Sequence, residues 1–411
     1  MKKIIILQNS PVFTVDIAKI FNPNFWELHL LANKESYNHL HNRNQHILFN
    51  TITIIHDFNF NNLKNNIIPI INNVDKESVV FATNSESLVG ITGQLREYFN
   101  IPGVHTNVAR IFTDKVVMKK HLSSFNILLP NYIDFNFNEY SKMPTNYIKK
   151  ISQKLSFPII AKPIDSAGSN GVRKINNINE LAQWATSIEK NGFELDEYIT
   201  GELYHCDSFV HNGNILYTAV CHYSSPPHKF LLGHNLGSIT LPNNDICYQE
   251  LKKFNDYVLK NISTDFNGVT HLEVFKKDNG ELIFLEIAYR GGGAGIPHMY
   301  QKHLNIDLFS THFLLQSYDD YQLNIYPSYY SAWIQFSPSS NVINIKDIPK
   351  TKSEISLVSR NEKINANSPC FSLRDYSLLI VLWNNNFTQL QQDFAKLSQL
   401  ALKTQEKHRN E

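Results

Sequence analysis

Two glutamates on facing strands are the first sign of chemistry in this sequence. Two apolar runs, residues 269–277 and 281–289, flank an Asp-Asn-Gly sequence whose last two residues are typical of a two-residue hairpin turn. Counting outward from that turn places Glu273 directly opposite Glu286, with about 5 Å between their Cβ atoms. Like charges that face each other across a strand pair are destabilising, so this pair requires an explanation.

A cation between the two carboxylates would remove their repulsion. Carboxylate oxygens are the ligands that Mg²⁺ prefers, usually together with water and substrate phosphates. One divalent ion, or two, bound by Glu273 and Glu286 is therefore the first hypothesis. The alternative is structural: Arg290, four residues after Glu286, pairs with one carboxylate while solvent covers the other.

A lysine at the end of an apolar strand, followed by a loop of small residues, forms the second pattern. The strand begins near Phe157 and ends at Lys162, and the loop runs from Asp165 to Gly171. Small residues let backbone N–H groups approach phosphate oxygens, and the lysine adds a point charge. The small residues of the loop are Ser166, Gly168, Ser169 and Gly171. A plain surface turn is the alternative, and no P-loop consensus is present.

The third pattern is the segment FELDEYITGELYHCD, residues 193–207. Its backbone groups could hold a base, and the carboxylate of Glu202 could reach a ribose. The residues that would present those backbone groups are Asp196, Glu197, Tyr198 and Ile199.

Composition narrows the class of partner. The 411 residues carry a formal net charge of +1, which gives no reason to expect nucleic acid or an acidic membrane. No apolar run reaches membrane-spanning length, and the four cysteines form no CxxC pair. We therefore expect a cytoplasmic protein that binds small molecules, with no nucleic acid or membrane partner; a homodimer is compatible with the sequence.

The order of elements predicts three blocks. Strand-like runs alternate with helical segments in residues 1–111, which indicates an α/β unit with a parallel sheet. Residues 112–320 have an α+β pattern, and residues 321–411 form a C-terminal α+β block. The last block should end in a helix over residues 388–404, where apolar residues recur at helical spacing.

Four motifs in order resemble the ATP-grasp superfamily. They are TDKVVMKKHL, IIAKPIDSAGSNGV, DEYITGE and the hairpin HLEV…LIFLEIAYRGGG, and together they span about residues 113–308. Within that superfamily, GELYHCD and EIAYRGGG look most like carboxylate–amine ligases that include the L-amino acid ligases. The resemblance implies a Rossmann-like preATP-grasp domain, the ATP-grasp fold and a C-terminal α+β domain.

The resemblance also implies a set of ligands and residue roles. ATP and Mg²⁺, with Mn²⁺ as an allowed substitute, would be the cofactors. Lys115 and Lys162 would contact the ATP phosphates, with the loop of residues 165–171 covering them. Residues 196–199 would hold adenine and Glu202 the ribose. The two facing glutamates, Glu273 and Glu286, would bind the metal.

The remaining roles concern the reacting groups. Arg290 would face the reacting phosphoryl or acyl oxygen, and the backbone of Gly291, Gly292 and Gly293 would hold an oxyanion. His271 would contact phosphate or substrate, or would simply be packed. Ala288 stands where many relatives have an asparagine that binds metal. No role follows for His205, Asp207, His222, His228 or His234, although the loop around the last three is expected to line a substrate pocket.

The reaction that the resemblance implies joins a carboxylate to an amine. The carboxylate would attack the γ-phosphorus of ATP to form an acyl phosphate, and the amine would then displace phosphate, with ADP as the other product. Amino acids are the expected substrates. Two alternatives remain: the same chemistry with a thiol or another acceptor, and a regulatory nucleotide-binding protein without catalysis.

Overall fold

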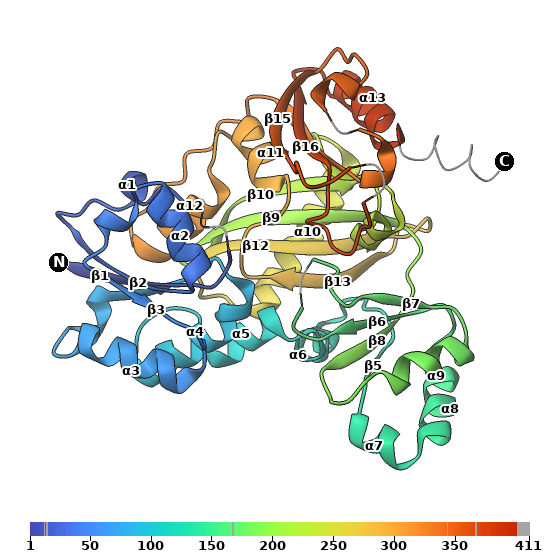
Figure 1. The fold of residues 1–411 in the computed structure, drawn as a ribbon, viewed down its shortest axis with the longest axis horizontal. Helices are drawn as coiled ribbons and strands as arrows, with labels where there is room; N and C mark the ends of the chain where they lie inside the picture. Colours follow the sequence, from blue (N-terminus) through green and yellow to red (C-terminus); the bar gives the residue numbers. More distant parts are fainter. Residues whose placement is uncertain (12, 14, 167, 343, 366–367, 401–411) are drawn as a thin grey trace.

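The computed structural model describes residues 1–11, 13, 15–166, 168–342, 344–365 and 368–400. It contains three β-sheets, shown together in Figure 1. Within the described residues, no helix is both long enough and apolar enough to cross a membrane. The predicted final helix over residues 388–404 is observed as α13 (Phe387–Ser398), and residues 401–404 of that prediction lie outside the described residues.

The N-terminal part is a parallel sheet in the order β3-β2-β1-β4. Ile4 and Ile6 of the first strand pack into one core cluster and Ile5 and Leu7 into another, because helices cover both faces. The strands are β1 (Lys2–Gln8), β2 (Trp26–Ala32), β3 (Thr51–Ile54) and β4 (Val79–Ala82). The helices are α1 (Ile17–Ile20), α2 (Lys34–Asn42), α3 (Phe60–Ile71), α4 (Glu86–Phe99), α5 (Thr106–Thr113) and α6 (Lys115–Leu122). This confirms the α/β prediction.

A small antiparallel sheet in the order β5-β8-β6-β7 lies apart from the other two sheets, with its helices on the outer side (Figure 1). Its strands are β5 (Tyr132–Asp134), β6 (Ile159–Pro163), β7 (Arg173–Ile175) and β8 (Phe193–Glu197). Its helices are α7 (Phe137–Lys142), α8 (Pro144–Lys154) and α9 (Ile178–Thr186). Leu195 and Trp184 belong to its separate hydrophobic core. This sheet therefore carries both the Lys162 strand and the start of the 193–207 segment.

The third sheet has eight strands in the order β13-β12-β9-β10-β11-β14-β16-β15. They are β9 (Glu202–His211), β10 (Asn214–Tyr223), β11 (Leu236–Thr240), β12 (Gly268–Lys276), β13 (Leu282–Ala288), β14 (Tyr330–Phe336), β15 (Glu354–Arg360) and β16 (Leu378–Asn384). Its further helices are α10 (Ile246–Ile262), α11 (Ile296–His303) and α12 (Leu308–Ser317). Short 3-10 turns occur at His46–Leu48, Lys76–Ser78, Ser123–Phe125, Pro227–Leu232, Pro338–Ser340 and Ile345–Asp347. Strands from residues 202–288 and 330–384 thus share one sheet, and a division at residues 320 and 321 stays a prediction.

The β12–β13 hairpin pairs Glu273 with Glu286 as predicted, but its turn is different. Lys277 N donates to Glu281 O at 2.9 Å, so three residues form the loop, and of these only Gly280 has a left-handed φ, +87°. A type I′ turn needs positive φ at both central residues, so the two-residue prediction was wrong. The register then shifts between Glu273 and Val274, which restores the predicted pair.

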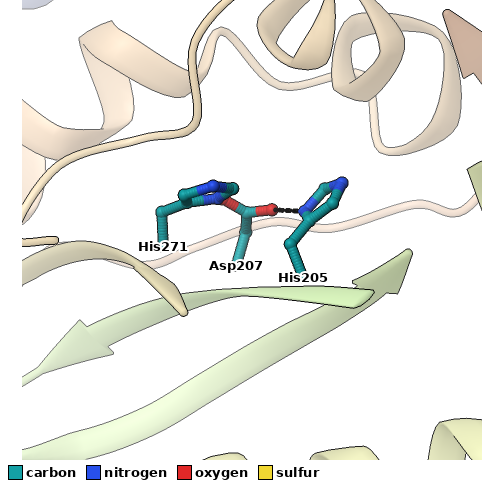
Figure 2. Close-up of side chains that lie close together, drawn as sticks. All are labelled: His205, Asp207 and His271. Atoms are coloured by element: carbon teal, nitrogen blue, oxygen red, sulfur yellow. Dashed lines mark hydrogen bonds and ion pairs between the residues drawn. The ribbon is translucent and has the colours of Figure 1, made fainter. Parts of the chain in front are cut away.

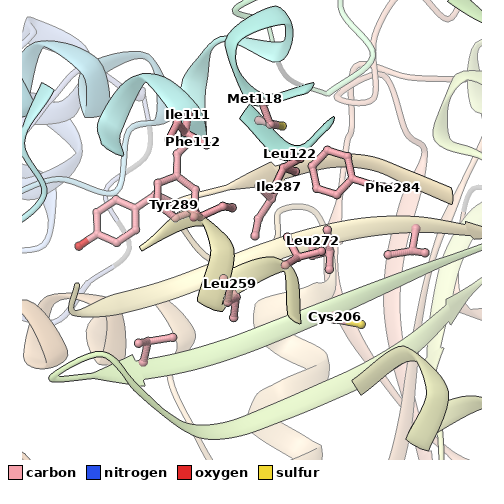
Figure 3. Packing of buried hydrophobic residues seen from close by; sticks show 14 of the residues in the cluster. Ile111, Phe112, Met118, Leu122, Cys206, Leu259, Leu272, Phe284, Ile287 and Tyr289 are labelled. Carbon is pink, nitrogen blue, oxygen red and sulfur yellow. The ribbon is translucent and has the colours of Figure 1, made fainter. Parts of the chain in front are cut away.

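This register shift decides what the hairpin presents to each side. Phe284 and Ile287 pack into the core beneath the hairpin, together with Met118 and Leu122 of α6 (Figure 3). Leu285 and Glu286, the two residues between them, both line a cleft on the opposite side. The β-bulge therefore places Glu286 and its apolar neighbour Leu285 on the same side of the hairpin, facing the cleft.

Candidate functional site

A cleft lies between the small sheet and the β12–β13 hairpin. It brings together most of the residues singled out from the sequence: Lys115, Lys162, Ser166, Gly168, Ser169, Asp196, Glu197, Tyr198, Ile199, Glu273 and Glu286. Other predicted residues are not on its lining: Gly171, Glu202, His271, Arg290, Gly291, Gly292 and Gly293. The roles given to all these residues remain predictions, but their positions set what the cleft can do.

Apolar side chains from both sides of the cleft line it together with charged groups. Ile160 and Val172 come from the small-sheet side, and Leu203, Phe275 and Leu285 come from the eight-stranded sheet. Such apolar side chains fit a planar aromatic ring system, while the lysines and glutamates fit phosphates and a divalent cation. The donor set is therefore appropriate for a metal-bound nucleotide.

Glu286 is held by a lysine where a metal ion was expected. Lys115 Nζ lies 3.3 Å from Glu286 Oε2, and the same ammonium group donates to the backbone oxygen of Ser166 at 2.7 Å. Burial by itself would raise the pKa of Glu286, but the charges of Lys115 and Lys162 outweigh it and lower the pKa to about 2. Glu286 is therefore an anion at neutral pH, balanced by a residue of α6.

Lys162 belongs to a buried group of four charges. Its Nζ lies 2.9 Å from Asp196 Oδ2 and 3.3 Å from Glu194 Oε1. On the far side of the two acids, Lys119 of α6 is fully buried and lies 3.0 Å from Glu194 Oε2, with Asp196 as its other partner. Two ammonium groups and two carboxylates therefore alternate, and we call Lys119, Lys162, Glu194 and Asp196 the charge quartet.

The quartet explains a pKa shift and exposes two residues that the sequence analysis missed. Burial would lower the pKa of Lys162, but Asp196, Glu194 and Glu286 raise it, so the lysine keeps its charge. Lys119 and Glu194 had not been singled out. A signal was present: Lys119 lies one helical turn after Lys115, and Glu194 lies two residues before Asp196 on the same strand face.

Three residues of the small-residue loop have a left-handed backbone conformation. Gly168, Ser169 and Gly171 have φ of +65°, +57° and +76°. A Cβ atom at Gly168 would meet no heavy atom within 4 Å, whereas one at Gly171 would lie 2.9 Å from Pro163 Cγ. Gly168 is thus open on the cleft side, and Gly171 is needed for close packing against the end of β6.

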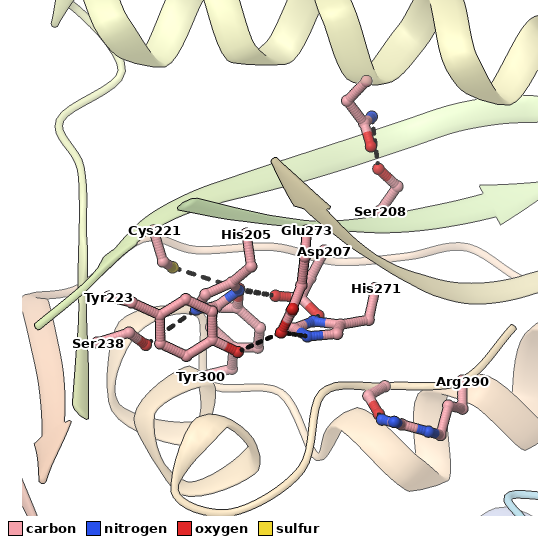
Figure 4. A network of polar contacts seen from close by, with 12 residues as sticks. His205, Asp207, Ser208, Cys221, Tyr223, Ser238, His271, Glu273, Arg290 and Tyr300 are labelled. Atoms are coloured by element: carbon pink, nitrogen blue, oxygen red, sulfur yellow. Dashed lines mark hydrogen bonds and ion pairs between the residues drawn. The ribbon is translucent and has the colours of Figure 1, made fainter. Parts of the chain in front are cut away.

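Arg290 is paired outside the cleft. Its Nε lies 2.6 Å from Glu86 Oε2, in the first turn of α4, and its Nη1 donates to the backbone oxygen of Gly291 at 2.8 Å. Figure 4 shows Arg290 beside the polar network that surrounds Glu273. Burial would lower the pKa of Arg290, but Glu86 raises it. The N-terminal block therefore supplies the residue that orients this guanidinium.

Glu273, the other glutamate of the facing pair, is held by a tyrosine hydroxyl and a histidine. Tyr223 OH donates to Glu273 Oε1 at 3.1 Å, and His271 Nε2 lies 3.5 Å from the same oxygen. His271 Nδ1 also lies 2.9 Å from Asp207 Oδ1. Burial would lower the pKa of His271, but Asp207 and Glu273 raise it to about 10. His271 is therefore a charged link between Glu273 and a buried aspartate.

Asp207 is the centre of that network. Its Oδ2 accepts from Tyr300 OH at 2.6 Å. The same oxygen lies 2.6 Å from His205 Nδ1 (Figure 2). His205 Nε2 lies 2.9 Å from Ser238 Oγ. Among the described residues, His205, Asp207 and His271 are close enough to share a metal ion, but their facing atoms already bond one another. We interpret the three residues as support for Glu273.

His228 and His222 lie in different surroundings. His228 lines the cleft beside Pro226 and Pro227, and burial lowers its pKa to about 4, so it is neutral there. His222 Nε2 lies 2.6 Å from Glu202 Oε2, which turns that carboxylate toward a neighbouring strand. A ribose contact by Glu202 would require this pair to open.

Comparisons with known proteins give a family match and several similar proteins. The model of the ATP-grasp domain family matches residues 155–298. An L-arginine-specific L-amino acid ligase from Bacillus subtilis is 30% identical over 259 residues, which is 61% of this chain and 60% of that protein. A D-alanine–D-alanine ligase from Staphylococcus epidermidis is 36% identical over 94 residues, 22% of this chain and 26% of the relative. The chain thus matches less than two thirds of the length of either relative.

Solved structures resemble nearly the whole chain. An L-amino acid ligase from Bacillus licheniformis aligns with a TM-score of 0.68 at 13% identity and covers 97% of both chains. An N5-carboxyaminoimidazole synthase from Aspergillus clavatus, in complex with ADP and 5-aminoimidazole ribonucleotide, aligns with a TM-score of 0.69 at 12% identity and covers 98% of this chain and 99% of that one. At these identities the likeness concerns the fold. Residues 155–298 therefore match the ATP-grasp domain family, and the chain as a whole shares the fold of these two solved structures.

Proposed function

We propose that this protein is an ATP-dependent, ADP-forming ligase that joins a carboxylate to an amine. The observation that carries the proposal is the meeting of two facing carboxylates, Glu273 and Glu286, with two buried lysines, Lys115 and Lys162, in one cleft. The ATP-grasp domain and the similarity to the Bacillus subtilis ligase support it. Amino acids are the proposed substrates, and the cytoplasm is the proposed location.

The cleft residues divide the nucleotide between them. The apolar side chains of the cleft and the backbone of residues 196–199 hold the base. Lys115, Lys162 and the loop of residues 165–171 hold the phosphates. Glu273 and Glu286 would hold Mg²⁺, which would supply charge neutralisation at the phosphates. Glu286 is paired with Lys115 in this structure, so it would give up this ion pair to a metal ion, and the Lys115 ammonium group would then be available to the phosphates.

Arg290 and the glycines after it follow Glu286 on the chain, outside the lining of the cleft, and act on the groups that react. The substrate carboxylate attacks the γ-phosphorus, ADP leaves and an acyl phosphate remains. Arg290 stabilises the charge on the transferring group, held in orientation by Glu86. The amine then attacks the acyl carbon, the C–O bond to phosphate breaks, and backbone N–H groups at residues 291–293 hold the oxyanion. Positioning and charge, rather than a protein nucleophile, account for the rate.

Replacing Glu286 with glutamine tests the metal site. The isostere keeps the volume and removes the charge, and because outer-shell groups alone are worth 10–100-fold, we expect ATP turnover to fall by about a hundredfold or more. The pKa of Glu286 is lowered from 4.5 to about 2, so its charge stabilises the folded protein above pH 4.5 and that contribution is lost as the pH falls toward 2. The variant should therefore be no more stable than the wild type at neutral pH.

The matched control is Glu281→Gln. Glu281 is an exposed glutamate at the tip of the same hairpin, 3.3 Å from Lys277 Nζ. Turnover measured by phosphate release, together with thermal unfolding, compares the two variants. Normal turnover in Glu286→Gln, or an equal loss in Glu281→Gln, would contradict the metal assignment.

The charge quartet generates a prediction about binding. Lys119→Met leaves two carboxylates facing only Lys162, so the floor of the phosphate site gains a net negative charge. We expect ADP affinity to fall by about tenfold while adenosine affinity changes less than about twofold, because adenosine has no phosphate. Adding Glu194→Gln restores the charge balance and should recover most of the loss. Isothermal calorimetry measures each affinity; equal losses for ADP and adenosine, with no recovery, would mean that Lys119 only fills space.

The products distinguish this mechanism from adenylation. Charged groups gather at the β,γ end of the proposed nucleotide, so the leaving group should be ADP rather than AMP. With hydroxylamine in place of the amine, the acyl phosphate should be trapped as a hydroxamate in equal amount to ADP. Chromatography after incubation with ATP, Mg²⁺ and pooled L-amino acids decides the question. Stoichiometric AMP would overturn the mechanism, and ADP without hydroxamate would favour an ATPase, a different acceptor chemistry or the regulatory alternative.

A further inference from the structure

A second cavity opens where three distant parts of the chain meet. The first part is Ser10, which follows β1, and the second is the segment from Gly293 to the start of α12. The third is Arg374, which lies on the loop before β16. A Cβ atom at Gly293 would meet no heavy atom within 4 Å, so the backbone is open at this point. The cavity therefore begins where the proposed oxyanion segment ends, outside the nucleotide cleft.

Arg374 is the cation of this cavity. Within the described residues, only its backbone is engaged, through a hydrogen bond from Arg374 N to Ser372 Oγ at 3.2 Å. Among the described residues, the neighbouring Asp375 forms no ion pair with Arg374, and its Oδ2 accepts from Phe371 N and Ser372 N, each at 2.8 Å. Its own loop thus uses the Asp375 carboxylate, and the guanidinium of Arg374 faces the cavity without a protein anion bound to it.

The other titratable groups of the cavity leave that charge in place. Asp307 Oδ1 caps α12 by accepting from Ser310 N at 2.8 Å. Burial lowers the pKa of His298, with Asp307 opposing the shift, so this histidine is predominantly neutral near pH 7. The cavity therefore offers one guanidinium with free donors and one carboxylate that is partly engaged. A planar guanidinium is suited to bidentate binding of a carboxylate.

The ligation reaction indicates which of the two substrates would supply the carboxylate bound by Arg374. The donor's carboxylate is the one that becomes phosphorylated, so it must lie near Glu273, Glu286 and Arg290. A second carboxylate site beyond Gly293 can serve only the partner substrate. We propose that Arg374 binds the α-carboxylate of the acceptor amino acid and so selects acceptors that are amino acids rather than simple amines. This inference rests on the proposed function and names the acceptor class for the same reaction.

The proposed placement is consistent with the bond changes. With its carboxylate on Arg374, the acceptor would present its neutral amino nitrogen at Gly293, where this cavity meets the proposed oxyanion segment. The C–N bond forms, the C–O bond to phosphate breaks with its electron pair on phosphate, and the proton lost from nitrogen passes to solvent. The C-terminal block thereby contributes Arg374, a residue that lies outside the family match over residues 155–298.

Partitioning between two nucleophiles tests the assignment. The enzyme is supplied with ATP, Mg²⁺ and pooled L-amino acids, with or without hydroxylamine, which carries no carboxylate. Mass spectrometry measures dipeptides and hydroxamates. For Arg374→Ala we expect the ratio of dipeptide to hydroxamate to fall at least about tenfold, because a charged hydrogen-bonded pair is worth roughly that much or more. Arg374→Lys should recover part of the ratio.

Two further measurements complete the design. Arg360→Ala removes another exposed arginine of the same C-terminal block and should leave the ratio unchanged. ADP affinity by calorimetry should be the same in Arg374→Ala and the wild type, which shows that the variant is folded. L-alaninamide, which lacks a carboxylate, should be used equally well as an acceptor by both proteins.

The outcomes separate the two proposals. Hydroxamate formation by the wild type with an unchanged ratio in Arg374→Ala would overturn the acceptor site alone. An equal loss of dipeptide and hydroxamate in a variant that binds ADP normally would also overturn it, since the defect would precede the acceptor. A wild type that forms neither ADP nor hydroxamate would overturn the proposed function and this inference with it.

Discussion

The repulsion between Glu273 and Glu286 is the constraint around which the rest of the cleft is arranged. Strand pairing holds the two carboxylates on one face, and the hairpin cannot separate them without losing its register. Each carboxylate is therefore compensated from a different direction. Lys115 of α6 reaches Glu286, while Tyr223 and His271 hold Glu273. Helix α6, the central strands and the hairpin are thus linked by the contacts that balance the charges of these two glutamates.

The sequence predicted this pair through an argument that was only partly correct. The Asp-Asn-Gly turn indicated a hairpin, but the loop has three residues, and the register shift near Val274 cancels the error. Turn chemistry is local and can be read from a few residues, whereas a bulge depends on packing beneath the strand. Here Phe284 and Ile287 must both face the core, and this requirement is visible only when α6 is in place.

Long-range partners account for most of what the sequence analysis missed. Arg290 was predicted to be important, yet its partner Glu86 lies 204 residues away in another block. Glu194 and Lys119 meet only because α6 brings Lys119 against β8 of the small sheet. The eight-stranded sheet likewise joins strands of the middle and C-terminal blocks, although the alternation of strands and turns in the sequence does not indicate which strands become neighbours. Local sequence patterns identify candidate charged side chains, and the fold determines which of these side chains form ion pairs with one another.

The ion pairs already present in the cleft have a consequence for selectivity. A free metal ion that displaced Lys115 from Glu286 would leave an ammonium group without its anion, and a free triphosphate that drew Lys162 away would leave Asp196 and Glu194 sharing only Lys119. Each ligand alone breaks a pair and satisfies one half of it, at the cost of an uncompensated buried charge. A metal ion and a triphosphate bound together would satisfy both halves. On the proposed function, the ion pairs of the resting cleft would therefore favour the metal–nucleotide complex over either ion alone.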